Sequence, residues 1–174
     1  MYTSKITGLG YYVPENVVTN DDLSKLMDTN DSTSVIAVKA STIALERANL
    51  QPNDIDMIVF ATLSPDMYFP GGGVEVQEMM GMRTIPALDV RNQCSGFVYA
   101  LSVADQFVKT GMYKNILVIG SENHSGGLDF STRGRNVSVI FGDGAGAAVV
   151  SRNETGKGGI LSTHLHSEGQ HKNE

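Results

Sequence analysis

One cysteine and its neighbours carry the first chemical signal in this sequence. Cys94 is the only cysteine among 174 residues; a short apolar segment at 86–90 precedes it, and the small residues Ser95 and Gly96 follow. Apolar residues then recur with helical spacing as far as Gly111, which predicts a helix that begins at Cys94. Free amide groups and aligned peptide dipoles at a helix start stabilise an anion, so this position favours a thiolate. We therefore predict that Cys94 is a catalytic nucleophile.

A structural role is the alternative for Cys94. A single cysteine in a globular protein is usually a small buried hydrophobic residue. The succession of strand, sharp turn, cysteine, glycine and amphipathic helix favours catalysis, because hydrolases present their nucleophile on a similar turn. The prediction fails if Cys94 lies within a helix and is enclosed by aliphatic side chains with no channel to solvent.

The segments around Cys94 predict an α/β fold. Apolar runs predict strands at 4–13, 57–61, 86–90, 115–120 and 145–151. Periodic apolar residues predict helices at 34–50, at 74–80 and, after a cap at Thr19 or Asn20, up to Met27. Residues 137–141 and 145–151 flank a glycine-rich turn and are expected to form a hairpin, and 160–164 is a candidate last strand. The alternation predicts a largely parallel sheet with an antiparallel addition.

Composition narrows the classes of function. The chain is one domain long, with a net charge of −6 at pH 7, which argues against nucleic-acid binding because that needs a basic face. No apolar run reaches membrane-spanning length, and the first residues do not have the pattern of a signal peptide. A single cysteine excludes an intrachain disulfide. These features predict a cytoplasmic protein that binds neither nucleic acid nor membrane.

Three motifs in order resemble one enzyme family. The stretch DVRNQCSGFVYALSVADQFVKTG, followed by ILVIGSE and FGDGAGAAVV, resembles the N-terminal half of the 3-oxoacyl-acyl-carrier-protein synthase III enzymes of the thiolase superfamily. The resemblance implies an α/β, thiolase-like half domain over residues 1–174. It further implies a mixed, mostly parallel five-stranded sheet in the order βαβαβαββ, with helices packed on it. Relative to the family we expect a loop after Asp31 to be missing, and the C-terminal half, which supplies a catalytic histidine and asparagine, to be absent.

The resemblance also implies an activity. Cys94 would take an acyl group from acyl-coenzyme A and pass it to malonyl-acyl-carrier protein with loss of carbon dioxide, in a homodimer that starts fatty-acid synthesis. Coenzyme A would enter only as the substrate thioester, so no cofactor is expected, and this chain alone is expected to be inactive. Another condensing enzyme of the thiolase fold, such as a hydroxymethylglutaryl-coenzyme A synthase or a secondary-metabolite ketosynthase, stays open as an alternative, as does a noncatalytic half subunit or scaffold.

Three further residues are predicted to bind substrate because they match family positions. Phe69 would line the acyl pocket of the partner subunit, although an aromatic residue in a polar loop is usually a loop anchor. Arg135 and Thr29 would contact coenzyme A; without the resemblance they would be a solvated residue and a cap or turn residue.

The remaining motifs give weaker indications of function. An acidic carrier would need a local basic patch, for which Lys39, Arg47, Arg133 and Arg135 are candidates. The histidines show no metal-binding spacing, His124 is isolated in sequence, and Glu122 receives no chemical role. Gly142-Asp143-Gly144 lacks the lysine of a phosphate loop and is predicted to be structural.

Overall fold

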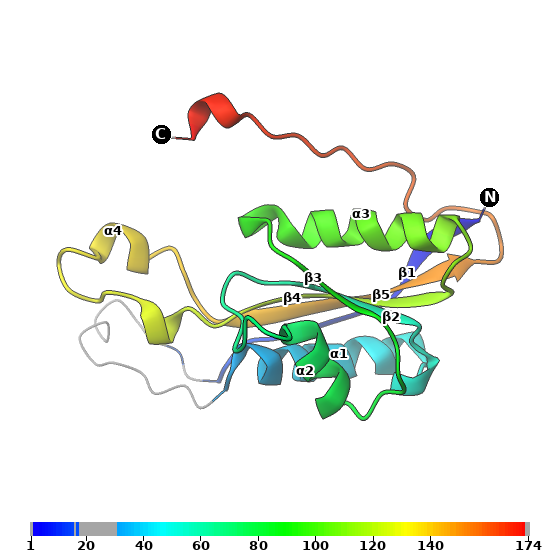
Figure 1. Cartoon of the computed structure of the whole chain (residues 1–174), viewed down its shortest axis with the longest axis horizontal. Coiled ribbons are helices and arrows are strands. Elements are labelled where there is room, and N and C mark those ends of the chain that lie inside the picture. Colours follow the sequence, from blue (N-terminus) through cyan, green and yellow to red (C-terminus); the bar gives the residue numbers. More distant parts are fainter. Residues whose placement is uncertain (1, 16, 18–30, 173–174) are drawn as a thin grey trace.

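A computed structural model describes residues 2–15, 17 and 31–172. These residues form a five-stranded sheet with helices on both faces (Figure 1). The strands are β1 (Thr3–Tyr12), β2 (Met57–Ala61), β3 (Ala87–Val90), β4 (Asn115–Glu122) and β5 (Gly144–Asn153). The helices are α1 (Thr33–Ala48), α2 (Gly72–Met79), α3 (Gly96–Lys109) and the one-turn α4 (Arg135–Ser138). Apart from α4, this order is the predicted βαβαβαββ.

The strand order in the sheet is β1-β5-β4-β2-β3. β2 is parallel to β3 and β4, whereas β5 is antiparallel to β4 and β1. Four strands therefore run in one direction and β5 runs against them, which confirms the predicted mixed, mostly parallel sheet. Because β2, β3 and β4 are parallel, the residues that follow each of them meet at one edge of the sheet.

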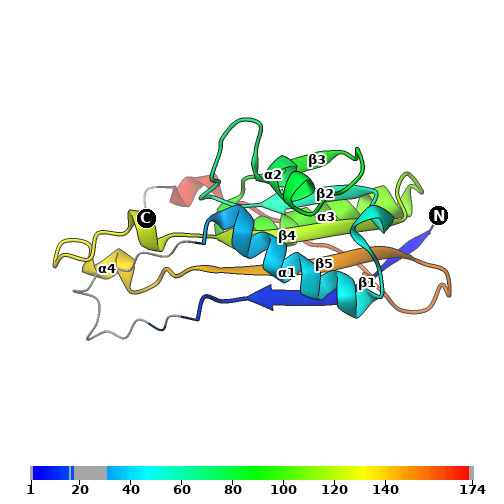
Figure 2. The same cartoon turned by 90° about the horizontal axis from the view of Figure 1, so that it is seen from below.

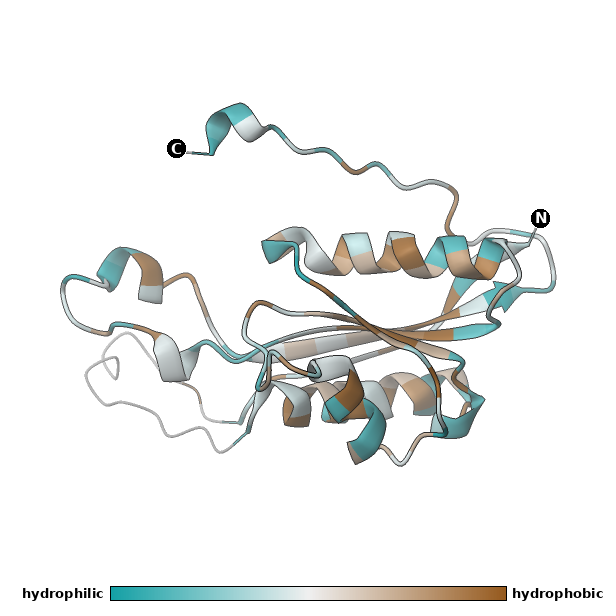
Figure 3. Cartoon of the chain, in the orientation of Figure 1, coloured by the Kyte–Doolittle hydropathy of each residue, from teal (hydrophilic) through white to brown (hydrophobic). Residues whose placement is uncertain are grey.

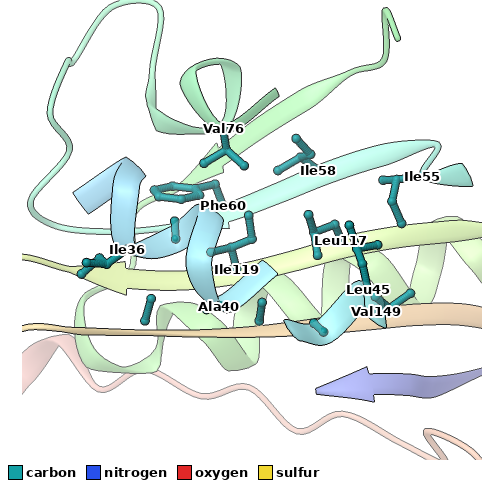
Figure 4. Close-up of a cluster of buried hydrophobic side chains, with 14 of the residues drawn as sticks. Ile36, Ala40, Leu45, Ile55, Ile58, Phe60, Val76, Leu117, Ile119 and Val149 are labelled. Atoms are coloured by element: carbon teal, nitrogen blue, oxygen red, sulfur yellow. The ribbon is translucent and has the colours of Figure 1, made fainter. Parts of the chain in front are cut away.

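The centre of the sheet is apolar on both faces. All five residues of β2 are buried, as are the first five of β4, as expected for strands with helices on both sides. One cluster lies between the sheet and the helices α1 and α2 (Figure 4), and it includes Ile36, Ala40, Phe60, Val76, Leu117, Ile119 and Val149. A second lies between the sheet and α3, and it includes Val59, Ala100, Ala104, Val108, Val118 and Val150. Figure 3 shows these hydrophobic residues along the strands and the inward sides of the helices.

α1 lies against β1 and β5, and α2 lies against β2 and β3 (Figure 2). The contact of α1 with β1 depends on two glycines, because a Cβ atom on Gly8 would overlap the carbonyl oxygen of Ala44, and one on Gly10 that of Ala40. The absence of a side chain at both positions therefore allows α1 to approach β1 closely.

The predicted hairpin at the end of the chain is wrong. Residues 137–141 form part of α4 and a turn rather than a strand, and the glycines 142, 144 and 146 do not have positive φ angles. β5 has no free edge for a hairpin partner, since β1 and β4 pair with it along its length, from Tyr12 and Glu122 at one end to Thr3 and Asn115 at the other.

The candidate strand at 160–164 is also wrong. Ile160 donates one backbone hydrogen bond to Ser4, 3.0 Å, and the segment then runs along the outer side of α3 without strand pairing (Figure 1). There Ser102 donates to Thr163 at 3.3 Å, and the hydroxyls of Tyr99 and Ser167 lie 3.4 Å apart.

The predicted helix that ends at Met27 lies outside the described residues. Within the described part of the chain, none of the helices has the length and hydrophobicity needed to cross a bilayer.

Candidate active site

Cys94 lies in the turn that joins β3 to α3. Residues Gln93–Ser95 form a single 3-10 turn, and α3 begins at Gly96, so the predicted helix start was two residues too early. Gln93 has a φ of 46°, which sharpens the turn, and the side chain of Asn92 donates to the Ser95 hydroxyl at 3.0 Å. The thiol side of the turn is exposed, so the prediction that Cys94 is accessible at the opening of a helix is confirmed.

Gly96 lets the start of α3 lie close to β2. A Cβ atom at this position would be 3.3 Å from the Cβ of Ala61, the last residue of β2. A larger side chain would push the turn that carries Cys94 away from the sheet edge. Gly96 therefore has a packing role at the start of α3.

Cys94 opens into a cleft of about 270 Å³, which we call the Cys94 cleft. Its walls come from the residues that follow β2, β3 and β4 and from those that precede β5: Leu63, Gln93, Cys94, Glu122, His124, Ile140, Phe141 and Gly142. This volume leaves room for a short acyl group. The cleft thus lies where the carboxyl ends of the three parallel strands meet.

Glu122 fixes the wall that follows β2. Its carboxylate accepts hydrogen bonds from the backbone N–H groups of Leu63, 2.8 Å, and Ser64, 3.1 Å. It also accepts from the hydroxyls of Ser64, 2.5 Å, and Thr62, 3.3 Å. Sequence reasoning gave Glu122 no role; the structure shows that it joins the end of β4 to the loop after β2.

His124 contributes its imidazole to the cleft. Its Nε2 atom lies 3.5 Å from Glu122 Oε2, and its ring meets Phe141 edge-on with centroids 5.0 Å apart. Its backbone N–H donates to Asp143 at 2.7 Å. His124, which is isolated from the other histidines in sequence, thus lies near Glu122 and Cys94 in space, because the sheet brings the end of β4 next to the turn after β3.

Asp143, in the glycine-rich turn, accepts hydrogen bonds from the loop after β4. Besides His124, its carboxylate accepts from the backbone N–H of Ser125, 2.9 Å, and from the Ser125 hydroxyl, 2.5 Å. The turn before β5 is therefore tied to the loop after β4, which closes the side of the cleft formed by Phe141 and Gly142. The predicted structural role of this motif fits these contacts, although the predicted hairpin does not.

The other predicted site residues lie outside this cleft. Phe69 is 90% exposed on the loop between β2 and α2. Arg135 is the exposed first residue of α4, and neither side chain lines the cleft. Thr29 lies outside the described residues. The roles assigned to these three residues stay predictions.

No metal-binding group is evident in residues 2–15, 17 and 31–172, where no three His, Cys, Asp or Glu side chains gather closely enough to hold an ion. The groups present in the cleft are instead a thiol, a carboxylate and an imidazole. They suit covalent chemistry at sulfur with polar groups beside it.

Known proteins match this chain over nearly all its length. The family model for 3-oxoacyl-[acyl-carrier-protein (ACP)] synthase III matches residues 88–169, which include Cys94 and the cleft-lining segments after it. A β-ketoacyl-[acyl-carrier-protein] synthase III of Caldanaerobacter subterraneus subsp. tengcongensis is 46% identical over 183 residues, covering 94% of this chain and 54% of that protein. One from Aliivibrio fischeri is 44% identical, covering 96% and 57%.

Solved structures agree with this match. The 3-oxoacyl-[acyl-carrier-protein] synthase III of Aquifex aeolicus VF5 superposes with a TM-score of 0.81 at 40% identity, over 87% of this chain and 54% of that one. The chain belongs to the 3-oxoacyl-acyl-carrier-protein synthase III family.

The matching proteins of the synthase III family are longer than this chain. This chain spans about half the length of the curated relatives it matches. The priming β-ketosynthase of the R1128 polyketide pathway has the same fold, with a TM-score of 0.81 at 28% identity, over 88% of this chain and 51% of that one. The thiolase-like α/β half domain is thus shared by synthase III enzymes and related ketosynthases.

Proposed function

We propose that this chain is the nucleophile-bearing half of an enzyme that starts fatty-acid synthesis by joining an acyl group to malonyl-acyl-carrier protein. One observation carries the proposal: in a chain of the synthase III family, Cys94 is exposed at the mouth of a cleft formed at the ends of three parallel strands. A structural cysteine has no need of this position.

The reaction has two stages. In the first, Cys94 Sγ attacks the carbonyl carbon of an acyl-coenzyme A thioester; a new C–S bond forms, the bond to the coenzyme sulfur breaks, and the coenzyme leaves as its thiol. In the second, the malonyl group loses carbon dioxide, and the resulting carbanion attacks the acyl carbon and releases Cys94. The product is a 3-oxoacyl group on the carrier protein.

This chain supplies part of the machinery for these steps. The helix α3 starts two residues after Cys94, so the thiol lies beside the end of the helix dipole that carries partial positive charge. Groups that hold the developing oxyanions in the second stage would come from outside these 174 residues, in line with the histidine and asparagine implied by the resemblance. The first stage is therefore the step to test at Cys94.

The test is acylation of the cysteine. Purified protein is incubated with acetyl-coenzyme A, and its intact mass and tryptic peptides are measured. This chain alone is expected not to complete the condensation, but it contains the nucleophile of the first stage. We therefore expect one acetyl group on the peptide that contains Cys94 and none in a Cys94→Ala variant, which should fold normally because the side chain is exposed. Absence of the adduct with acetyl, butyryl and hexanoyl donors alike would overturn the proposal.

The partners are part of the proposal. A homodimer is supported by the loop that carries Phe69, since Met67, Tyr68 and Phe69 are all exposed and a second subunit would cover them. For the acidic carrier, Arg135 is the candidate on α4, whereas Lys39 pairs with Asp31 at 2.5 Å. The single cysteine and the net charge of −6 support a cytoplasmic location.

A ketosynthase that primes a polyketide is the second candidate. The R1128 priming enzyme superposes as well as the Aquifex enzyme does, although at lower identity. Profiling of acyl donors and acceptor carriers separates the two, because only a fatty-acid enzyme would prefer the carrier protein of fatty-acid synthesis.

A further inference from the structure

The Cys94 cleft combines an apolar wall with two polar side chains. Leu63, Ile140 and Phe141 provide hydrocarbon surface, whereas Glu122 and His124 provide charge and hydrogen-bonding groups. A cleft for a plain alkyl chain would gain nothing from a carboxylate and an imidazole, because both prefer water or a polar partner. The polar pair therefore raises the question of which group it contacts when the cleft is filled.

Glu122 is already occupied by the protein. Four donors from residues 62–64 use both oxygens of its carboxylate, at distances from 2.5 to 3.3 Å. Its remaining neighbour is His124 Nε2 at 3.5 Å. Glu122 thus acts on the loop after β2 and on His124, and has little capacity left for a ligand.

Three contacts fix the position of His124, but its imidazole has hydrogen-bonding capacity left. Glu122 faces its Nε2 atom, Phe141 contacts the ring edge-on, and Asp143 holds its backbone N–H. The side chain is 20% exposed, and Nδ1 makes no hydrogen bond to any of the residues that the structure describes; because it is not one of the fully buried polar atoms without a partner, it is accessible to solvent in the cleft. A polar atom that faces the cleft is hydrogen-bonded to water until a ligand displaces that water, and the ligand must then replace the bond or leave Nδ1 unpaired.

The geometry points to His124 as a specificity-determining residue of the Cys94 cleft: it selects short acyl groups that carry a hydrogen-bonding substituent, such as a hydroxyl, over plain alkyl groups of the same size. The inference rests on the proposed function, because it assumes that the group on Cys94 fills this cleft. A hydroxyl can donate to or accept from an imidazole nitrogen, and it avoids the repulsion that a carboxylate would meet from Glu122. The apolar wall accommodates the rest of the short chain.

The experiment compares two donors that differ only by one hydroxyl group in purified native protein. Cys94 is acylated with butyryl-coenzyme A and with 3-hydroxybutyryl-coenzyme A, and the ratio of the two rates is measured by intact mass. We expect the native ratio to favour the hydroxylated donor and to fall about three- to tenfold in His124→Leu, which keeps the volume but loses the polar nitrogen. His124→Gln should restore part of the ratio.

The control is His166→Leu, a substitution of the same type at an exposed histidine of the C-terminal segment. It should leave the ratio as in the native protein. A ratio also cancels any general loss of thiol reactivity or folding, which would slow both donors equally. The same ratio in native protein and in His124→Leu would overturn the inference, as would a native preference for butyryl.

A second readout separates this inference from the proposed function. Alkylation of Cys94 by N-(3-hydroxypropyl)iodoacetamide and by N-butyl iodoacetamide needs the cleft but no thioester chemistry. If no donor acylates Cys94, the proposed acyl transfer fails, and a drop in the hydroxypropyl-to-butyl ratio in His124→Leu would still support polar recognition by His124. An unchanged alkylation ratio would overturn the role of His124 as well.

Discussion

At the scale of single residues, Glu122 shapes the cleft mainly through the backbone it holds. Its carboxylate joins two loops that follow neighbouring parallel strands, so the position of Leu63 depends on a side chain 59 residues away in sequence. Such a carboxylate is sensitive to the loss of one oxygen, because four donors then compete for one acceptor.

The variant Glu122→Gln tests this role. We expect a loss of about 1–3 kcal/mol in the free energy of unfolding, since buried donors on residues 62–64 are left unpaired. Urea denaturation followed by circular dichroism measures it. Glu154→Gln, at an exposed position after β5, serves as the matched control and should change stability by less than about 0.5 kcal/mol. Equal stability of the two variants would show that Glu122 does not anchor the loop.

Cys94 and His124 illustrate what sequence could and could not predict at this scale. Cys94 was identifiable because its signal is local: a strand, a turn, two small residues and a helix adjoin it. The relation of His124 to Cys94 is not local, since it arises only when β3 and β4 take their places on either side of β2. A signal was nevertheless present, because both residues closely follow predicted strands whose ends meet in a parallel sheet.

At the scale of elements, carboxylates that are distant in sequence accept hydrogen bonds from the first backbone N–H groups of two helices. Asp66 accepts from the backbone N–H groups of Thr33, 2.9 Å, and Ser34, 2.7 Å, at the start of α1. Asp89 on β3 does the same for Gly72, 2.7 Å, and Gly73, 2.9 Å, at the start of α2. Each cap joins a helix to the edge of the sheet that carries the cleft.

The cap of α1 predicts a dependence of stability on pH. Partial burial raises the pKa of Asp66, but hydrogen bonds from Ser34, Ser32 and Thr33 outweigh it and lower that pKa below its ordinary value. The folded state therefore prefers the carboxylate, so this stabilisation is present at neutral pH and is lost as the pH falls below about 4.

Thermal unfolding of native protein and Asp66→Ala at several pH values measures this effect. We expect the variant to be less stable by about 1 kcal/mol at pH 7, a typical value for an N-cap residue. The difference in stability between native protein and variant should decrease between pH 4 and pH 2, because a protonated Asp66 no longer stabilises the start of α1 as a carboxylate. A difference that stays constant over this range would contradict an ionised cap.

The contact between α1 and β1 gives the third prediction. Gly10→Ala places a methyl group against the backbone of α1 at Ala40, so helix and strand must separate. We expect a loss of about 1–3 kcal/mol in the free energy of unfolding, as for other overpacked sites. Gly146→Ala on the neighbouring β5 is the control, since the added methyl group there meets nothing within 4 Å. If both variants unfold at the same urea concentration, the close approach has no energetic importance.

At the scale of the whole molecule, the sequence predicted most elements but placed the last segments wrongly. β2, β3, β4 and α1 were recognisable because runs of buried apolar residues and helical periodicity are local properties. Residues 137–141 also contain several apolar residues, yet a strand there would need a free edge on β5. Only the arrangement of the complete sheet shows that β1 and β4 already occupy both sides of β5.

That arrangement has a consequence for biosynthesis. Among the described residues β1 pairs only with β5, and the register sets Thr3 opposite Asn153, so β1 leaves the ribosome long before the strand that pairs with it. At a translation rate of about 5–20 residues per second, the delay is roughly 8–30 seconds. During this interval the nascent β1, with the apolar side chains of Ile6 and Leu9 and its backbone unpaired, is a site for association with other chains. The chaperones that meet the emerging polypeptide would therefore be expected to act on β1.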